Sequence, residues 1–240
     1  MDFVDAVWAS NLKIYTLLQS EGLSEHHHQS FSMGAGGDKS SGIDLVAEKI
    51  FIDYLHPFGT IISEESGVIE NTHAKCEIIL DPIDGSDNLL SHIPYYGTSV
   101  ALKENGKTIK AIVTNLANGD IFIKDEKSFQ KGNLLTPLLS PVTCNPFGKV
   151  GIFERSYCSK IVDKKLKEAC IKYRSPGAFA LSLAYAHDVA FVLYEGPIRV
   201  YDVEAGFLMC EDLYTFHQDD IYLVSKDKET FDKIIGLFIS

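Results

Sequence analysis

The chain has 240 residues, of which 45% are hydrophobic and 23% are charged, and its formal net charge at pH 7 is −11. This composition is typical of a soluble globular protein, and the length allows one large domain or two closely joined lobes. The acidic balance argues against a general nucleic-acid-binding protein, because such proteins gain affinity from Lys and Arg side chains that contact phosphates.

The cysteines and the N-terminus indicate the compartment. The five cysteines are odd in number and form no Cys-x-x-Cys pair, which favours reduced thiols over a disulfide framework or a zinc site. The N-terminus lacks the basic start and the apolar core of a signal peptide. The long apolar stretch at residues 177–194 is interrupted by His187 and Asp188. We therefore expect a cytoplasmic protein with no membrane partner.

The N-terminal third contains two predicted helices with a polar segment between them. Apolar residues recur every three or four positions over residues 3–18 and again over residues 44–55, which is typical of amphipathic helices. Residues 21–37 are polar and glycine-rich, and they include three consecutive histidines at residues 26–28. Three consecutive side chains cannot all face one metal ion, so we expect a solvated loop. The sequence leaves open whether this loop closes over a ligand.

A series of β-strands follows. Short apolar or alternating segments predict strands at residues 60–63, 77–80, 97–103, 108–115 and 120–124. The last three are separated by Asn-Gly pairs, which are typical of hairpin turns.

The remaining sequence predicts a second lobe. Residues 128–149 contain three prolines and have weak periodicity, so we interpret them as a connection. We place an N-terminal lobe at residues 1–135 and a C-terminal α/β lobe at residues 136–240, joined as one compact unit. In the second lobe we expect strands at residues 171–174, 189–194 and 221–225, and helices at residues 179–187, 202–210 and 228–238. This order favours a layered α/β or α+β enzyme.

The most informative segment runs from Asp81 to Ser86, directly after a predicted strand. Ligands in α/β proteins bind at the carboxyl ends of strands, which support side chains rigidly. Pro82 fixes its own φ and Gly85 permits a tight turn, so Asp81 and Asp84 can converge on one centre. Two carboxylates so close repel each other unless a cation neutralises them, and oxygen ligands of this kind select Mg²⁺ or Mn²⁺. The N-terminal lobe is therefore the expected metal-binding lobe.

The same segment offers hydrogen-bond donors to an anion. The N–H groups of Gly85 and Ser86 begin a predicted helix, where a phosphate is favoured. The simpler alternative is an Asp-Gly turn with Asp84 or Ser86 as a helix cap, and a lone Asp-Gly-Ser would favour it. The complete hexapeptide after an apolar strand, with Glu64 and Glu65 upstream, favours a metal and phosphate site instead.

Three segments together resemble the signatures of the inositol monophosphatase and fructose-1,6-bisphosphatase superfamily. They are ISEESG at residues 62–67, LDPIDGSDN at residues 80–88 and YDVEAG at residues 201–206. The resemblance runs from about residue 38 to the C-terminus. Ser86 and the Gly-Ala-Phe at residues 177–179 are most similar to archaeal-type enzymes that hydrolyse both inositol phosphate and fructose bisphosphate. The resemblance implies the layered αβαβα sandwich of these sugar phosphatases.

The resemblance also implies a set of metal ligands. Glu64, Asp81 and the main-chain carbonyl of Ile83 would bind a first Mg²⁺ ion. Asp81, Asp84 and Asp202 would bind a second ion, and Glu64 would help to hold a weaker third one. Two ions about 3.5–4 Å apart can stabilise both the attacking and the leaving oxygen of an in-line displacement.

The catalytic step implied by the resemblance uses two further residues. Asp44 would pair with Ser86 to orient and deprotonate a metal-activated water, so that the phosphoryl group transfers directly to water without a phosphoenzyme. Lithium would inhibit by competing for a metal position.

Four residues are candidates for contact with the substrate besides Ser86. Gly85 and Ala178 would lie against it. Glu195 could accept hydrogen bonds from polyol hydroxyls, or it could be an acid in water at a strand end. Arg199 could bind a second phosphate in bidentate fashion, or it could neutralise a nearby acid.

The expected function is a magnesium-dependent phosphomonoesterase of a small phosphorylated polyol or sugar. Inositol monophosphate and fructose 1,6-bisphosphate are the leading substrates, and the resemblance also allows nucleotide 3′-phosphates, sulfated nucleotides and histidinol phosphate. We expect a homodimer with no nucleic-acid partner. The alternative is a regulatory protein that keeps the fold and acts through a protein partner, as some bacterial relatives do in transcription complexes.

Overall fold

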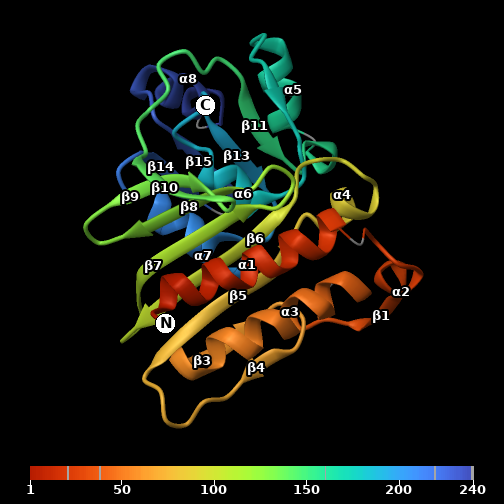
Figure 1. Ribbon diagram of the computed structural model, residues 1–240. Coiled ribbons are helices and arrows are strands. Elements are labelled where there is room, and N and C mark those ends of the chain that lie inside the picture. Colours follow the sequence, from red (N-terminus) through yellow and green to blue (C-terminus); the bar gives the residue numbers. More distant parts are fainter. Residues whose placement is uncertain (21, 38, 160, 219, 239–240) are drawn as a thin grey trace.

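The computed structural model describes residues 1–20, 22–37, 39–159, 161–218 and 220–238. The described strands form an eight-stranded sheet, a five-stranded sheet and a small two-stranded sheet. The two large sheets are stacked, with helices between them and on both outer faces (Figure 1). The chain therefore adopts the layered αβαβα sandwich that the resemblance implied.

The eight-stranded sheet has the strand order β10-β9-β8-β7-β6-β5-β3-β4. Its strands are β3 (Thr60–Ser63), β4 (Gly67–Ile69), β5 (Cys76–Asp84), β6 (Gly97–Glu104), β7 (Lys107–Asn115), β8 (Asp120–Asp125), β9 (Phe129–Asn133) and β10 (Thr136–Pro141). β3 and β5 run parallel, whereas the other neighbours described are antiparallel. β3, which Glu64 follows, and β5, which contains Asp81 and Asp84, therefore end at the same edge of the sheet.

Side chains alternate between the two faces of this sheet. Along β5, Ile78 and Leu80 pack into the core under α1 (Phe3–Ser20) and α3 (Gly42–Leu55), whereas Ile79 points into the opposite layer. The opposite layer contains α6 and α7, which lie between the two large sheets. These helices are α6 (Phe179–Ala184) and α7 (Val200–Met209).

The five-stranded sheet completes the second half of the molecule. Its order is β12-β11-β13-β15-β14, from β11 (Gly151–Glu154), β12 (Tyr173–Arg174), β13 (Val192–Glu195), β14 (Tyr214–Gln218) and β15 (Ile221–Ser225). The outer helices α5 (Val162–Glu168) and α8 (Lys228–Phe238) pack on its far face, where Phe153, Leu223 and Ile234 belong to one buried cluster.

Most of the predicted elements are confirmed. The helices expected at residues 3–18, 44–55, 202–210 and 228–238 are present within two residues at each end. A short 3-10 turn, η1 (His56–Phe58), follows α3 and contains Pro57. The helix expected at residues 179–187 ends earlier, at Ala184.

The prediction of a loop at residues 21–37 is wrong for part of that segment, and Glu21 lies outside the described residues. The segment contains the short helix α2 (Glu25–His28) and the strand β1 (Ser30–Met33), which pairs with β2 (Lys39–Ser41). The short helix α2 packs closely on α3, and this contact accounts for its regular structure. The packing is so close that a Cβ atom at Gly42 would lie 2.1 Å from the His26 carbonyl oxygen.

The interpretation of residues 128–149 as a connection is also wrong in its first half. Residues 129–141 form β9 and β10, which extend the large sheet to its edge. β10 is exposed along its whole length, so it lacks the alternation that reveals a half-buried strand. A link between the two sheets remains only between Pro141 and Gly151.

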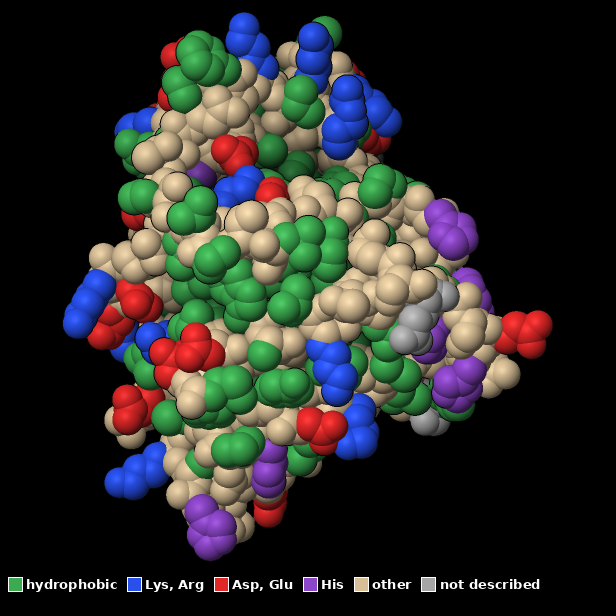
Figure 2. Space-filling model, viewed as in Figure 1, with side chains coloured by type: hydrophobic (Ala, Val, Ile, Leu, Met, Phe, Trp, Pro, Cys, Tyr) green, Lys and Arg blue, Asp and Glu red, His purple; other side chains and the backbone are tan. Residues whose placement is uncertain are grey.

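The surface carries both charged and apolar side chains. In Figure 2, hydrophobic side chains gather in the middle of the face on which α1 lies, with charged groups mostly around them. Across the described part of the chain, we find no helix whose length and apolar character would let it cross a membrane.

Candidate active site

A cavity of about 640 Å³ opens where β3 and β5 end, between the two halves of the molecule. Elements from both large sheets line it, as expected for the carboxyl ends of parallel strands. Its described lining includes eight acidic residues: Asp44, Glu64, Glu65, Asp81, Asp84, Asp87, Glu154 and Asp202. The cations in that lining are Lys39, Arg155 and Arg199. The cavity is therefore strongly acidic.

Three of these acids form a compact cluster. Glu64, Asp81 and Asp202 each offer a carboxylate oxygen, and these oxygens all lie within 4.8 Å of one another. Asp81 and Asp202 are buried, and Oδ1 of Asp81 has no hydrogen-bond partner in the described part of the chain. A buried carboxylate oxygen without a partner is costly unless a cation contacts it. The donor set of oxygens fits a hard divalent ion such as Mg²⁺.

The charges in the cluster perturb one another. Burial raises the pKa of Asp81 well above its usual value, and the negative charges of Glu64 and Asp84 raise this pKa further. Burial also raises the pKa of Asp84, although the Leu181 amide donates a hydrogen bond to its Oδ2 at 2.7 Å. The protein by itself disfavours full ionisation of these groups, and a bound cation would favour it.

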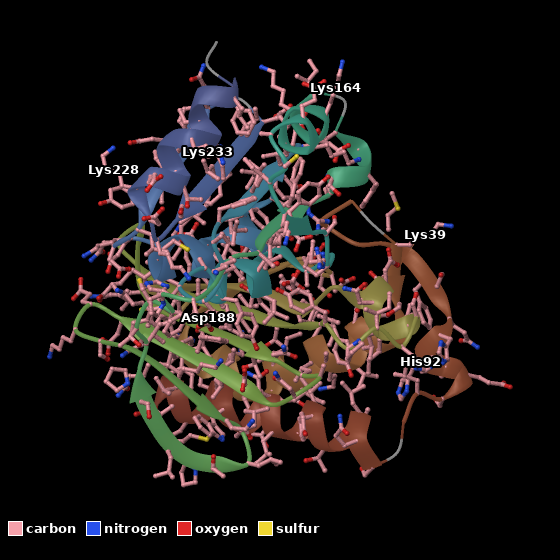
Figure 3. The ribbon with its side chains drawn as sticks, turned by 90° about the horizontal axis from the view of Figure 1, so that it is seen from above. Lys39, His92, Lys164, Asp188, Lys228 and Lys233 are labelled. Atoms are coloured by element: carbon pink, nitrogen blue, oxygen red, sulfur yellow. The ribbon has the colours of Figure 1, made fainter. Side chains whose placement is uncertain are left out.

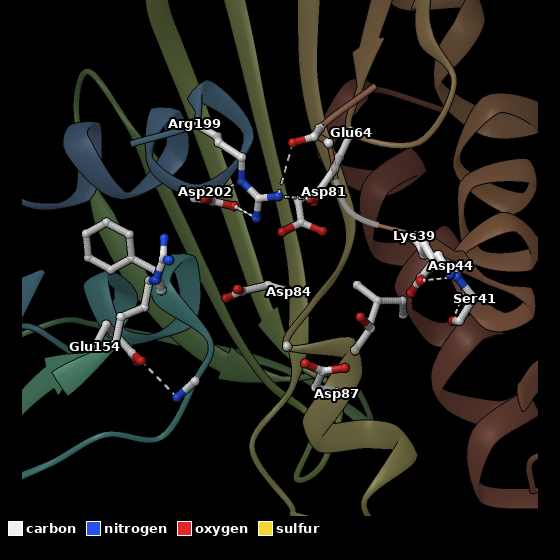
Figure 4. Close-up of a pocket in the computed structure, with 18 of the residues that line it drawn as sticks. Lys39, Ser41, Asp44, Glu64, Asp81, Asp84, Asp87, Glu154, Arg199 and Asp202 are labelled. Atoms are coloured by element: carbon white, nitrogen blue, oxygen red, sulfur yellow. Dashed lines mark hydrogen bonds and ion pairs between the residues drawn. The ribbon is translucent and has the colours of Figure 1, made fainter. Parts of the chain in front are cut away.

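Arg199 lies inside this cluster. Its Nη1 is 2.7 Å from Oε1 of Glu64, and its Nε and Nη2 donate to the two carboxylate oxygens of Asp202 at 3.0 and 3.1 Å (Figure 4). Of the two roles left open by the sequence, the structure shows the neutralisation of nearby acids. Contact with a second phosphate stays a prediction.

Asp44 and Ser86 line the same cavity from different elements. Asp44 lies in the first turn of α3, where its Oδ2 accepts the Ser41 amide at 2.8 Å. Its Oδ1 is buried and has no hydrogen-bond partner among the described residues, and burial raises its pKa. Ser86 begins α4 (Ser86–Leu90). The described hydrogen bonds include none between Asp44 and Ser86, so their direct pairing stays a prediction.

The turn at Gly85 requires glycine for two reasons. Its φ is +84°, in the left-handed region, and a Cβ atom here would lie 3.0 Å from Cβ of Ala178 and 3.1 Å from the Gly177 carbonyl oxygen. Ala178 thus packs against the turn, but it is not among the lining residues of the cavity. Ile83 is buried and does belong to the lining.

Glu195 lies outside the cavity lining, at the end of β13. Its Oε2 is buried and has no hydrogen-bond partner in the part of the chain that the structure describes. The structure therefore brings together Asp44, Glu64, Asp81, Ile83, Asp84, Gly85, Ser86, Arg199 and Asp202 around one cavity, and it leaves Ala178 and Glu195 off the lining.

Part of the polar segment at residues 21–37 reaches the cavity. Gly36 and Gly37 line it, and the Gly36 amide donates to the Glu64 carbonyl at 2.7 Å. A Cβ atom at Gly36 would lie 2.5 Å from Cγ of Glu64, so this approach depends on glycine. Lys39 also lines the cavity, on the opposite side of the molecule from Lys228 and Lys233 of α8 (Figure 3). The three histidines lie outside the lining.

The sequence reasoning missed Glu154, the last residue of β11. It lines the cavity, is 1% exposed and accepts hydrogen bonds from the Ser182 hydroxyl at 2.5 Å and the Gly177 amide at 2.8 Å. Burial raises its pKa. An acid directly after the apolar Gly-Ile-Phe segment was the available signal, and it is the same signal that indicated Asp81.

Glu65 is a further acid whose pKa the site raises. It accepts a hydrogen bond from the Ser40 hydroxyl. Burial raises its pKa to about 6, and the negative charges of Asp44 and Glu48 act in the same direction. Glu65 therefore lies beside the cluster as an acid with a raised pKa.

The comparison with known families agrees with this geometry. The sequence model described as "Inositol monophosphatase family" matches residues 15–213. The chain belongs to the inositol monophosphatase family.

Relatives within the inositol monophosphatase family carry two kinds of name. A fructose-1,6-bisphosphatase/inositol-1-monophosphatase of Methanothermobacter thermautotrophicus is 30% identical over 211 residues, which cover 79% of this chain and 74% of the relative. The Nus factor SuhB of Escherichia coli K12 is 28% identical over 193 residues, which cover 75% of this chain and 72% of the relative.

The family fold is also seen in solved structures. An inositol monophosphatase–fructose 1,6-bisphosphatase superposes with a TM-score of 0.79 at 21% identity, over 99% of this chain and 100% of that one. This similarity concerns the fold, and it agrees with the αβαβα layers described above.

Proposed function

We propose that this member of the inositol monophosphatase family is a magnesium-dependent phosphomonoesterase of small polyol or sugar phosphates. The observation that carries the proposal is the buried Asp81, whose Oδ1 has no partner among the described residues and which lies beside Glu64 and Asp202. The relative named fructose-1,6-bisphosphatase/inositol-1-monophosphatase supports the same class of substrate.

The residues that would hold the metal are Glu64, Asp81, Asp84 and Asp202, with the carbonyl of Ile83. Bound there, Mg²⁺ would supply positive charge that neutralises these carboxylates and the phosphate ester together. The ion pairs of Arg199 with Glu64 and Asp202 already supply part of this charge. The protein thus contributes a fixed acidic cage at the ends of two strands.

Asp44 and Ser86 would handle the attacking water. Oδ1 of Asp44 is buried and has no partner in the described residues, so it can accept a proton directly or through the Ser86 hydroxyl. The raised pKa of Asp44 makes it a better proton acceptor once it is ionised. Backbone N–H groups of Gly85 and Ser86 would orient the phosphate oxygens, and the phosphoryl group would pass directly to water.

A substrate panel tests the proposal. Phosphate release is measured from inositol 1-phosphate, fructose 1,6-bisphosphate, a nucleoside 3′-phosphate and histidinol phosphate, with Mg²⁺ and with EDTA. We expect Mg²⁺-dependent release from inositol 1-phosphate, fructose 1,6-bisphosphate or both. Release from none of the four esters would contradict the proposed function.

Direct transfer to water is tested separately by stereochemistry. Hydrolysis in labelled water of a substrate with a chiral phosphate should invert the configuration at phosphorus. Retention would indicate a phosphoenzyme and would contradict the direct displacement.

A regulatory role is a second candidate, and the relatives named Nus factor SuhB favour it. An Asp84→Asn variant separates the two roles, because it should lose hydrolysis and keep the outer surface. If cells that lack the protein show a defect and this variant corrects it, the result would point to the regulatory role.

We also propose a homodimer. Leu135 and Leu138, beside and within the edge strand β10, are 63% and 76% exposed, and exposed apolar side chains at an edge favour association. Light scattering should then give the mass of two chains.

A further inference from the structure

Glu154 is a buried acid in the cavity whose contacts lie on the side away from the metal cluster. It ends β11, and both of its oxygens accept hydrogen bonds, Oε2 from the Gly177 amide and Oε1 from the Ser182 hydroxyl. The Ala178 amide donates to it as well. One side chain of the second sheet therefore holds both the turn before α6 and, through Ser182, the helix itself.

The hydrogen bonds continue from Ser182 toward the first sheet. The Ser182 hydroxyl has one proton, which it donates to Glu154, so the Tyr95 hydroxyl at 3.0 Å must be the donor to Ser182. The neighbouring Leu181 amide donates to Oδ2 of Asp84 at 2.7 Å. In this way the α6 segment held by Glu154 also holds one carboxylate of the proposed metal site.

The turn held by Glu154 also contacts the segment after Asp84. Gly85 packs closely against Ala178 and the Gly177 carbonyl, to which a Cβ atom would come within 3.0 and 3.1 Å. Nδ2 of Asn88 donates to the Pro176 carbonyl at 2.6 Å and to the Tyr95 carbonyl at 2.7 Å. The two segments are therefore joined by hydrogen bonds on both sides of Gly85.

We propose that Glu154 is a positioning residue, which holds the turn before α6 and the Leu181 amide so that Asp84 and Gly85 keep their places in the cavity. This inference rests on the proposed phosphatase function, because a displacement of Asp84 or Gly85 is detected as a change in turnover. Figure 4 shows the arrangement, with Asp84 between Glu154 and the pair formed by Arg199 and Asp202.

The contacts of Glu154 distinguish this role from direct participation. Its side chain is 1% exposed and both of its oxygens accept hydrogen bonds from protein donors, so these contacts turn its carboxylate toward the protein. Its hydrogen bonds act on the site through Ser182, the turn and Leu181, and its negative charge also raises the pKa of Asp84. A positioning residue changes turnover through geometry, and a displacement of about 1 Å can lower the rate by roughly 100-fold.

A graded series of variants tests the inference. Glu154→Met keeps the side-chain volume but removes every acceptor, so kcat should fall by about 30- to 100-fold, with KM changed by less than about threefold. Glu154→Gln keeps one acceptor oxygen for the Gly177 amide, and it should restore kcat to within about 10-fold of the parent. Ser182→Ala should lower kcat by a few-fold, and its effect should not add fully to that of Glu154→Met.

A matched control separates positioning from stability. Ile234→Ala removes a buried side chain between α8 and the five-stranded sheet, outside the cavity lining, so it should lower the melting temperature and leave kcat unchanged. A second readout needs no activity. Amide hydrogen exchange at Leu181 and Gly177 should be faster in Glu154→Met than in the parent, and unchanged in Ile234→Ala.

Each outcome decides the inference. Turnover of Glu154→Met within twofold of the parent would overturn it, and so would a raised KM with unchanged kcat, which indicates substrate contact. An equal loss of kcat in Ile234→Ala would show that the loss in Glu154→Met comes from lower protein stability and not from positioning. If Glu154→Met does not fold, the Glu154→Gln and Ser182→Ala variants carry the same test. If the parent hydrolyses no ester, the proposed function fails, and unchanged exchange at Leu181 then overturns the positioning role independently.

Discussion

The two carboxylate oxygens of Asp44 have different surroundings. Oδ2 accepts the Ser41 amide and so caps the first turn of α3, whereas Oδ1 is buried and has no hydrogen-bond partner in the described residues. One oxygen thus fixes the side chain and the other is available as a proton acceptor. This division explains how Asp44 can accept a proton in the cavity while its side chain stays fixed on the helix.

Substitutions at Asp44 and Ser86 test their shared role. Asp44→Asn keeps an acceptor for the Ser41 amide but loses the base, so kcat should fall by about 10²- to 10⁴-fold with little change in stability. Ser86→Ala should lower kcat more than it changes KM. Steady-state kinetics at saturating Mg²⁺ gives both values, and an unchanged kcat in either variant would remove that residue from the chemistry.

The candidate site was largely predictable at the level of single residues. Asp81, Asp84 and Glu64 follow apolar strands, and that local pattern places a side chain at a sheet edge. The pairing of Arg199 with Glu64 was not predictable, because it joins residues far apart in the chain. Glu154 was missed because it ends a strand of only four residues, all of them buried, which shows no alternation.

At the scale of elements, buried patterns were easier to recognise than exposed ones. α1 and α3 show apolar spacing because each buries one face on the large sheet. β10 contains Pro137 and Pro141 and is exposed throughout, as an edge strand allows. Its presence depends on pairing with β9, which local sequence does not encode.

The contact between α6 and α7 depends on a glycine. A Cβ atom at Gly206 would lie 2.4 Å from Cδ1 of Leu183, so Gly206→Ala should lower the free energy of unfolding by about 1–3 kcal/mol. Gly236 of α8 is the matched control, because nothing lies within 4 Å of its Cβ position. Gly236→Ala should therefore stabilise by about 0.5–1 kcal/mol. Urea denaturation measures both, and equal effects would contradict the packing argument.

The start of α8 predicts a pH dependence. Hydrogen bonds from the hydroxyl and the amide of Thr230 lower the pKa of Asp227. A lowered pKa in the folded state stabilises the protein at pH values above the pKa of Asp in the unfolded chain, about 3.9. This stabilisation is lost as the pH falls through the pKa of Asp227 in the folded state. Asp227→Ala should cost about 0.5–1 kcal/mol at pH 7 and much less at pH 3.

The control for this prediction is Asp227→Asn, which keeps the cap without a titrating group. Its stability should stay near that of the parent at pH 7, measured by urea denaturation at both pH values. A loss from Asp227→Ala that is the same at pH 3 and pH 7 would show that ionisation of Asp227 has no part in the cap.

At the scale of the whole molecule, the cavity joins the two large sheets. Asp81 and Asp84 come from the eight-stranded sheet, whereas Glu154 comes from the five-stranded sheet and Asp202 from a helix between them. The lobe boundary expected at residue 135 stays a prediction. Because β10 belongs to the first sheet and β11 to the second, we propose that the boundary lies between Pro141 and Gly151.

The central claim is that the buried acids form a cation site for ester hydrolysis. Its most direct measurement is phosphate release from inositol 1-phosphate and fructose 1,6-bisphosphate, by the parent and by Asp81→Asn, with EDTA and after Mg²⁺ is restored. Asp120→Asn is the control, since Asp120 accepts the Tyr185 hydroxyl at 2.8 Å and lies outside the cavity lining.

We expect the parent and Asp120→Asn to lose activity in EDTA and regain it with Mg²⁺. We expect Asp81→Asn, with or without Mg²⁺, to stay at least about 100-fold less active than the parent in Mg²⁺. Hydrolysis that EDTA does not affect, at the same rate in Asp81→Asn as in the parent, would contradict the account.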